Sequence, residues 1–429
     1  MTSDWCVRSV AELQAAGTLL VEDGNHGENR PRPDEFSDDG IQFIRASDMD
    51  GGRVLFESAQ RINGTASERV RKGIGAGGDV LLSHKGTVGK VAYVPLNSPP
   101  FVCSPQTTFW RVIDETKIDR RYVYYYLTSR GFRQQLDARK GETDMADYVS
   151  LTSQRTLKVA VPPIEVQRSI VSVLGALDDK IELNRRMSQT LEAMARALFQ
   201  SWFVDFDPVR AKLDGTAPTG VSAQDARRFP EKFDQTVNGL LPVGWTFGSL
   251  GELCNLKRGH DLPSSTRGIG SVPVVSSAGV TGTHNEACAK GPGVVTGRYG
   301  TIGKVFFIET DYWPLNTTLY VDDFKGNPSR YIFHALGEVG FTKYTDKGAV
   351  PGVNRNHLHE ERMVIPPHEL RVAFAEAVQP FWALLAENER ESLALAATRD
   401  CLLPALLSGD LRMPVSKHGT RDAAERWPS

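Results

Sequence analysis

The sequence predicts an α+β protein in which two related globular domains are separated by two long, antiparallel coiled-coil helices. Two observations support this prediction. Four short segments recur in the same order along the 429-residue chain, and each copy ends in a proline pair followed by a heptad pattern of apolar residues. A chain of this length also exceeds what one hydrophobic core usually supports.

The recurring segments define an imperfect duplication. The matched pairs are "WCVRSVAEL" (5–13) with "WTFGSLGEL" (245–253), "GTVGKV" (86–91) with "GTIGKV" (300–305), "QTTFWRV" (106–112) with "NTTLYVD" (316–322), and "VAVPPIE" (159–165) with "MVIPPHE" (363–369). The offset falls from 240 to 214, 210 and 204, so the copies differ in the length of their interiors. Short Gly-Thr and Pro-Pro matches also arise by chance, but four matches in the same order argue against that explanation.

Each globular domain, residues 1–163 and 244–367, is expected to hold a curved, antiparallel-leaning sheet with one or two helices. Short β-prone runs such as "DVLLS", "KVAYVPL" and "TTFWRV" are punctuated by Gly, Pro, Ser and Asn. A helix-like stretch at 120–136 follows these runs, and 330–341 is its counterpart in the second copy.

Each domain is followed by a heptad segment, residues 164–206 and 368–409. The proline pairs disfavour helix before them and suit the first turn of a helix after them. Apolar residues then recur at a and d positions, which is typical of a coiled-coil seam. The predicted seam comprises Leu174, Leu177, Ile181, Asn184, Leu191 and Leu198 in the first helix, and Val378, Phe381, Leu385, Asn388, Leu395 and Leu402 in the second.

Polar residues occupy matching places in the two seams. Asn184 and Asn388 are 204 residues apart, as are Ser188 and Ser392. A polar residue in a seam fixes the register at a cost in stability, so we expect the helices to pair with each other; burial in two separate cores is the alternative. Antiparallel pairing would place the two domains at opposite ends of a rod, and Pro404 should kink or end the second helix.

Composition limits the remaining possibilities. Residues 207–243 are rich in Pro, Gly and charge, so we expect a linker running back along the helices, and residues 410–429 should form a polar tail. The five cysteines are scattered without a C-x-x-C pair, which argues against a zinc site and fits a reducing cytoplasm. We see no apolar run of roughly 18 to 20 residues and no export signal, so neither a membrane nor export is expected.

The two glycine loops, "SHKGTVGKVAYV" (83–94) and "GRYGTIGKVFFI" (297–308), resemble phosphate-binding loops but do not fit the nucleotide-binding pattern. That pattern requires Gly five positions before the second glycine and Ser or Thr after the lysine, whereas the first loop has His84 and Val91 there. Basic charge gathers around both loops: residues 61–140 carry 14 Lys/Arg against 6 Asp/Glu, although the chain's net charge is -2. An extended polyanion would bind there through its phosphates, and a solvated charged face is the alternative.

The candidate DNA-binding residues are basic and polar side chains in and beside the two glycine loops, together with four residues of the segment 23–49. They are Asn25, His26, Arg30, Arg45, His84, Lys85, Thr87 and Lys90 in the first copy, and Lys257, Arg258, His260, Arg298, Tyr299, Thr301 and Lys304 in the second. Phosphate contacts would position the chain, and side chains that differ between the copies would read bases. The alternative is a tight β-hairpin whose glycines serve only the turn.

No catalytic constellation emerges. "NSPPF" (97–101) resembles the N-P-P-F tetrapeptide of amino-methyltransferases, but Ser98 interrupts it, and "HLHEE" (357–361) lacks the spacing and third ligand of a zinc site. No Ser/His/Asp or Cys/His set appears. We therefore expect no catalytic residue, no metal site and no cofactor in this chain.

Several segments resemble the specificity (S) subunits of type I restriction–modification systems. The most specific is "WFVDFDPVRAKLDGTAPTG…RRFPEKFDQTVNGLLPVGW" (202–245), and "VAVPPIEVQRSIVSVLGALDDKIELNRR" (159–186) is similar to the family's proline-pair and long-helix region. Residues 401–413, 23–49 and 291–308 resemble its C-terminal helix end and its recognition-domain segments. One departure is "PPHELRVAF" (366–374), where the family tends to have a Glu-Gln pair, which leaves the start of the second helix less certain.

The resemblance implies a non-catalytic, cytoplasmic subunit with two target recognition domains, each reading one half of a bipartite site in double-stranded DNA. The paired helices would set the spacer between the halves. It also implies modification subunits, which methylate adenine with S-adenosylmethionine, and restriction subunits, which use ATP and Mg²⁺. The sequence does not specify the bases, the spacer length or the stoichiometry. An NTPase, a scaffold that only pairs partner proteins and the specificity subunit of a related system are the competing hypotheses.

Overall fold

The computed structural model describes residues 5–25, 27–140, 147–237, 239–344 and 352–412. The chain divides into two compact units, one formed by residues 1–184 with 390–429 and the other by residues 185–389. Each unit therefore holds one globular domain and one half of each long helix. None of the described helices combines the length and apolar character that a membrane span requires.

The first unit contains two main sheets with the strand orders β2-β12-β9-β10-β6-β5 and β3-β7-β4-β11-β8, and β1 pairs with β13. Its strands are β1 (Cys6–Ser9), β2 (Leu19–Asp23), β3 (Phe36–Ser37), β4 (Ile41–Ile44), β5 (Met49–Asp50), β6 (Arg53–Val54), β7 (Arg61–Ile62), β8 (Ile74–Gly75), β9 (Val80–Ser83), β10 (Val91–Tyr93), β11 (Phe101–Cys103), β12 (Thr107–Val112) and β13 (Lys158–Val161). Its short helices are α1 (Val10–Ala15), α2 (Gly64–Arg69), α3 (Arg120–Thr128), α4 (Arg130–Asp137) and α5 (Leu151–Thr156).

Strand β12 separates two cores because successive side chains of a strand point to opposite faces. Trp110 is buried among the helices, with its ring edge-on to Phe132 at 5.6 Å. Its neighbour Phe109 is buried in another cluster with Leu81 and Phe101. The near-continuous burial along this strand thus reflects packing on both faces.

The second unit contains sheets with the orders β17-β23-β20-β21 and β19-β18-β22, together with the pairs β16-β24 and β14-β15. Its strands are β14 (Phe233–Thr236), β15 (Gly239–Pro242), β16 (Thr246–Ser249), β17 (Asn255–Arg258), β18 (Val272–Ser276), β19 (Gly279–His284), β20 (Gly293–Gly297), β21 (Val305–Ile308), β22 (Trp313–Pro314), β23 (Thr318–Asp323) and β24 (Arg362–Ile365). Its short helices are α7 (Asp207–Leu213), α8 (Ala223–Ala226), α9 (Leu250–Leu253), α10 (Ser329–Gly337) and α11 (Arg355–His359).

The two units repeat the same strand registers, which confirms the duplication. Ser9 pairs with Lys158 in the first unit, and Ser249 pairs with Arg362 in the second, so the offsets of 240 and 204 are those of the sequence. Both serines begin a capping box with a glutamate three residues later. The predicted α+β class with a mainly antiparallel sheet is confirmed, and only three strand pairs, β10-β6, β11-β4 and β18-β22, are parallel among the described strands.

One repeat match is wrong by a single residue. The sequence aligns Thr107 with Thr317, but Thr107 pairs with Ser83 while Thr318 pairs with Gly297, the residue equivalent to Ser83. The correct offset is therefore 211. A one-residue shift moves every side chain of a strand to the opposite face, so the equivalent of Trp110 is Val321.

The predicted helix at 120–136 is instead two helices, α3 and α4, that meet at Ser129. This residue has an extended backbone, and its hydroxyl accepts a hydrogen bond from the Phe132 N–H. Serine is a favoured N-cap because it satisfies a free N–H of the first helical turn. The cap starts a new helix in a stretch whose apolar pattern is continuous.

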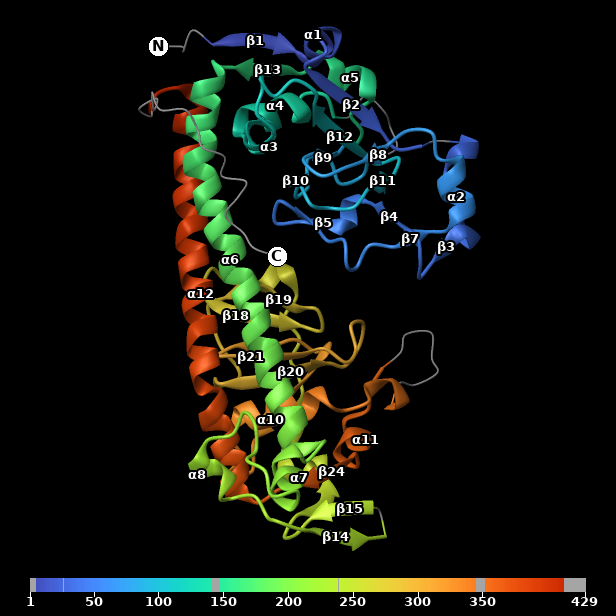
Figure 1. Cartoon of the computed structure of the whole chain (residues 1–429). Helices are drawn as coiled ribbons and strands as arrows, with labels where there is room; N and C mark the ends of the chain where they lie inside the picture. Colours follow the sequence, from blue (N-terminus) through green and yellow to red (C-terminus); the bar gives the residue numbers. More distant parts are fainter. Residues whose placement is uncertain (1–4, 26, 141–146, 238, 345–351, 413–429) are drawn as a thin grey trace. The chain divides into compact units, whose positions relative to one another are not determined.

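The two long helices are α6 (Ile164–Phe203) and α12 (His368–Ser408), and they pack together within each unit (Figure 1). In the first unit, Asp178 bonds with Arg399 at 2.7 Å and Asn184 with Ser392 at 3.4 Å. As the residue number in α6 rises from 178 to 184, the residue number of its partner in α12 falls from 399 to 392. The pairing is therefore antiparallel, as predicted. In the second unit Asn388 donates to Ser188 at 3.2 Å, the reciprocal contact.

Residues 207–243 pack into the second unit and do not form the predicted linker running back along the helices. They form α7, α8 and the β14-β15 hairpin, and Val209, Phe229 and Leu241 are buried in the unit's core. The second helix also passes Pro404 and ends at Ser408. Leu406 is 1% exposed in the core of the first unit, and this packing holds the last turn despite the lost backbone hydrogen bond.

Candidate nucleic-acid interface

The first glycine loop joins β9 to β10 and is closed by Ser83. The Ser83 N–H donates to the Lys90 carbonyl at 2.9 Å, and the Lys90 N–H donates to the Ser83 hydroxyl at 2.8 Å. Gly86 and Gly89 have φ values of 76° and 95°. These left-handed conformations favour glycine, so the glycines are needed for the turn itself.

The second loop joins β20 to β21 on the same framework. In the first unit the His84 N–H donates to the Gln106 carbonyl, and the His84 carbonyl accepts from the Val149 N–H. In the second unit the Arg298 N–H donates to the Thr317 carbonyl, and the Arg298 carbonyl accepts from the Val353 N–H. Gly300 and Gly303 also have positive φ values, 79° and 87°. The two loops therefore have one backbone design with different side chains.

The loop lysines differ between the units. Lys90 is half-buried, and its Nζ donates to the Met49 carbonyl at 2.9 Å, whereas Lys304 is exposed. In the first loop the exposed cation is Lys85, which lies 5.7 Å from the centre of the Tyr148 ring. In the second loop the Arg298 guanidinium lies 4.5 Å from the Tyr299 ring, a cation–π distance. Of the two predicted loop threonines, Thr87 is exposed and Thr301 half-exposed.

Two of the predicted DNA-binding residues belong to the internal framework. His84 is 0% exposed, and its Nδ1 lies 3.1 Å from the Val149 carbonyl. Asn25 is 2% exposed, and its side-chain oxygen accepts hydrogen bonds from the N–H groups of Arg71 and Lys72. Both side chains are buried in supporting positions, so we leave them out of the proposed contact surface. His26 lies outside the described residues.

Strand β17 differs in charge from its counterpart β2. Lys257 and Arg258 are exposed on β17, where β2 carries Glu22 and Asp23. In the first unit Asp23 pairs with Lys72 at 2.5 Å. His260 follows β17, half-exposed, with its Nε2 3.4 Å from the Tyr320 hydroxyl. The second unit therefore presents a basic strand edge that the first unit lacks, while Arg30 is exposed in the first unit.

The twelve predicted seam residues are all at least partly buried. Leu174, Asn184, Leu191, Val378 and Asn388 are buried, and the remaining seven predicted positions are half-buried. Asn184 also donates to the Glu391 carboxylate at 2.7 Å and accepts from Lys180 at 3.0 Å. The hydrogen bond from the Asn184 amide lowers the pKa of the Glu391 carboxyl group, and Lys180 lowers this pKa by a smaller amount.

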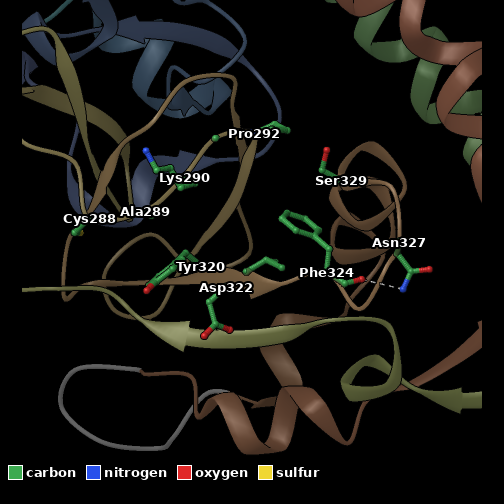
Figure 2. A pocket seen from close by; sticks show the side chains of 11 residues that line it. Cys288, Ala289, Lys290, Pro292, Tyr320, Asp322, Phe324, Asn327 and Ser329 are labelled. Carbon is green, nitrogen blue, oxygen red and sulfur yellow. Dashed lines mark hydrogen bonds between the residues drawn. The ribbon is translucent and has the colours of Figure 1, made fainter.

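A cavity of about 530 Å³ lies in the second unit at the start of β20, at the opposite end of that strand from the glycine loop (Figure 2). Cys288, Lys290, Tyr320 and Asp322 are among its lining residues. Burial raises the pKa of the Cys288 thiol to about 11, which disfavours the reactive thiolate form. Among the described residues, no group of three or more His, Cys, Asp or Glu side chains is arranged to hold a metal ion.

The structure adds residues that the sequence did not single out. Gln106 is exposed beside the first loop, and Gln60 contacts Arg45. The alignment of Gln106 with Thr317, at the corrected offset of 211, is the signal that could have found Gln106. The carbonyls of these two residues accept hydrogen bonds from equivalent loop residues, His84 and Arg298.

Part of the chain matches a known domain, and most of it is similar to curated proteins. Residues 21–193 match the model of the type I restriction modification DNA specificity domain. The type I restriction enzyme HindI specificity subunit of Haemophilus influenzae is 24% identical over 86% of this chain and 94% of the relative. The MjaIX specificity subunit of Methanocaldococcus jannaschii is 22% identical over 77% of this chain and 78% of the relative. A crystal structure of a type I S subunit from M. genitalium aligns with 94% of this chain and 96% of its own, at 16% identity and a TM-score of 0.49. Residues 21–193 thus match a type I restriction modification DNA specificity domain, and most of the chain is similar to type I restriction enzyme specificity subunits.

Proposed function

We propose that each unit reads one half of a bipartite sequence in double-stranded DNA, and that the paired helices α6 and α12 fix the spacing between the halves. The observation that carries this proposal is the repetition of one loop framework with different exposed side chains. The exposed Lys85 of the first loop corresponds to the exposed Tyr299 of the second, whereas the threonine at the next matching position but one, Thr87 or Thr301, is shared. One backbone design with two sets of contacts suits two different half-sites.

Within this proposal, exposed cations contact phosphates and fix the position of the chain on DNA. Lys85 and Lys304 are exposed in the two glycine loops, and Lys257 and Arg258 are exposed on β17. Phosphate contacts carry little sequence information, whereas hydrogen bonds to base edges specify the sequence. The differing side chains around each loop would supply those base contacts.

We further propose that the chain acts in the cytoplasm and catalyses no reaction itself. Adenine methylation with S-adenosylmethionine would belong to modification subunits docked on the helices, and ATP- and Mg²⁺-dependent translocation and cleavage to restriction subunits. The names of the curated relatives, which are specificity subunits, support this division of labour. A methylated base must be flipped from the stack, so the recognition chain need only deliver the methyltransferase to the correct position.

Footprinting tests the proposal directly. The full-length chain should protect two short segments of its site, separated by an unread spacer, and protection should strengthen when modification subunits are added. A single continuous footprint, or no sequence-specific protection, would refute the bipartite arrangement. Two further results separate the competing functions: ATP binding by the isolated chain would favour an NTPase, and unchanged DNA affinity of Lys304→Glu would favour a protein-pairing scaffold.

A further inference from the structure

Arg45 lies at a position where the two units share a backbone framework but differ in side chain. Ile44 pairs with Cys103, and its carbonyl accepts from the Ser104 N–H. In the second unit Val275 pairs with Pro314, and its carbonyl accepts from the Leu315 N–H. The residue that follows is Arg45 in the first unit and Ser276 in the second, so a base contact at this position would differ between the units.

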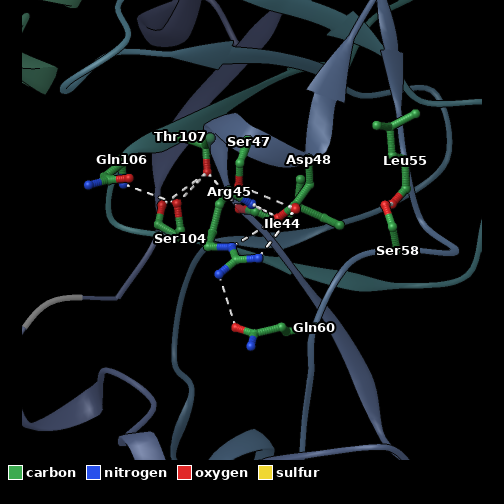
Figure 3. A network of polar contacts seen from close by, with 10 residues as sticks. All are labelled: Ile44, Arg45, Ser47, Asp48, Leu55, Ser58, Gln60, Ser104, Gln106 and Thr107. Carbon is green, nitrogen blue, oxygen red and sulfur yellow. Dashed lines mark hydrogen bonds and ion pairs between the residues drawn. The ribbon is translucent and has the colours of Figure 1, made fainter. Parts of the chain in front are cut away.

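The Arg45 guanidinium is held in a fixed orientation (Figure 3). Its Nε and one terminal nitrogen bond to the two oxygens of Asp48 at 3.2 and 3.4 Å, and the other terminal nitrogen donates to the Gln60 side-chain oxygen at 3.0 Å. The Asp48 side chain is 7% exposed and the Arg45 side chain 37% exposed. A buried carboxylate therefore anchors a guanidinium that solvent still reaches, with N–H groups left for a ligand.

The segment that carries Asp48 contacts the first glycine loop. The Lys90 Nζ donates to the carbonyl of Met49, which directly follows Asp48. The other flank of the loop contacts Gln106, whose carbonyl accepts from the His84 N–H. Gln106 is itself exposed, and the hydroxyls of Ser104 and Thr107 tie its segment to the Ile44 region.

The chemistry of these side chains indicates base reading. A guanidinium fork matches the O6 and N7 acceptors of guanine in the major groove, and a glutamine amide matches adenine. A residue held by neighbours loses little conformational freedom on binding. We propose that Arg45 is a specificity-determining residue that selects a guanine in the half-site of the first unit, with Asp48 and Gln60 as positioning residues. This inference rests on the proposed DNA-reading function and assigns one of its base contacts.

A purely structural ion pair between Arg45 and Asp48 is the competing explanation, and lysine distinguishes the two. Arg45→Lys keeps a cation beside the buried carboxylate, so a structural pair would survive, but it removes the planar fork that fits guanine. The matched control is Arg71→Lys, at another exposed arginine of the same unit, whose guanidinium donates to the Glu68 carbonyl.

The experiment selects preferred sequences from a random double-stranded DNA library, using the full-length chain assembled with modification subunits. Arg45→Lys and Arg45→Ala should each lose the guanine preference at one base pair of one half-site, by roughly 5- to 150-fold. The other half-site should be unchanged, and Arg71→Lys should retain both. Thermal unfolding of Arg45→Lys at the wild-type temperature would show that the loss is not a folding defect.

Two outcomes overturn the assignment. If both Arg45 variants keep the full preference, the arginine is structural; if they weaken binding equally at all sequences, it contacts phosphate. In either case the wild-type chain would still select a bipartite site. A wild-type chain that selects no bipartite site would instead refute the proposed function, and the assignment with it.

Discussion

Replacing Asn184 by alanine should loosen the helix pair locally and measurably. The Asn184 side chain is fully buried and bonds to Glu391, Ser392 and Lys180. The side chains of Glu391 and Lys180 are about 40% exposed and bond to each other at 3.0 Å, so they keep a partner when the amide is removed. Asn184→Ala should therefore lower the local stability of the helix pair by about 1–2 kcal/mol. This is the range for losing a hydrogen-bonded polar group, not for leaving a buried charge without a partner.

The assay is amide hydrogen exchange of peptides spanning residues 178–190. Where local opening governs exchange, this loss corresponds to roughly 5- to 30-fold faster exchange. The matched variant Asn388→Ala removes the bond to Ser188 and should have the smaller effect. Asn184→Leu should be neutral or stabilising, since an apolar side chain suits the seam and the polar one serves register. The reasoning is refuted if Asn184→Leu accelerates exchange more than Asn184→Ala.

Four other perturbations have defined outcomes. Lys304→Glu should weaken DNA binding at all sequences and reduce the slope of the logarithm of DNA affinity against the logarithm of salt concentration by about 1, which DNA titrations at several salt concentrations would measure. Lys90→Glu should instead lower the free energy of unfolding by about 1–3 kcal/mol, because the Lys90 ammonium bonds to the Met49 carbonyl. Urea unfolding of both variants measures this difference. Insertion of one heptad into both helices adds about 10 Å of helix and should lengthen the preferred spacer by roughly three base pairs; an unchanged spacer would exclude the helices as a ruler. The Arg69 guanidinium lowers the pKa of Glu35 to about 2, and the Arg32 N–H contributes to this shift. The stabilisation from the Glu35–Arg69 pair is therefore complete above the pKa of an unfolded glutamate, about 4.3, and is lost as the pH falls toward 2. The difference in unfolding midpoint between wild type and Glu35→Gln should shrink over this pH range. A Cβ at Gly24 would clash with the Cys103 carbonyl, while one at Gly64 would meet nothing within 4 Å, so Gly24→Ala should cost about 1–3 kcal/mol of unfolding free energy and Gly64→Ala almost nothing.

The duplicated fold and the helix pair could be predicted from sequence because their signals are local and periodic. "GTVGKV" and "GTIGKV" recur because each turn needs glycine at two positive-φ positions, and the seam repeats every seven residues. The matching Asn and Ser positions even identified the residues that bond across the helices.

Long-range packing accounts for the features that sequence could not predict. Lys90 contacts a carbonyl 41 residues away, and no local pattern distinguishes it from the exposed Lys304. Val209, Phe229 and Leu241 are too irregularly spaced to reveal that the segment between the repeats belongs to the second core. The contact of Arg45 with Gln60, 15 residues away, likewise depends on how the chain packs, whereas its pairing with Asp48 is a local contact three residues along the chain.

The central claim is that two related units read two separate half-sites. Sequencing the DNA that the full-length chain and its modification subunits select from a random library tests this claim most directly. We predict two short preferred blocks of different sequence, separated by a spacer of fixed length without base preference. One uninterrupted block, or two blocks whose separation varies freely, would contradict the account.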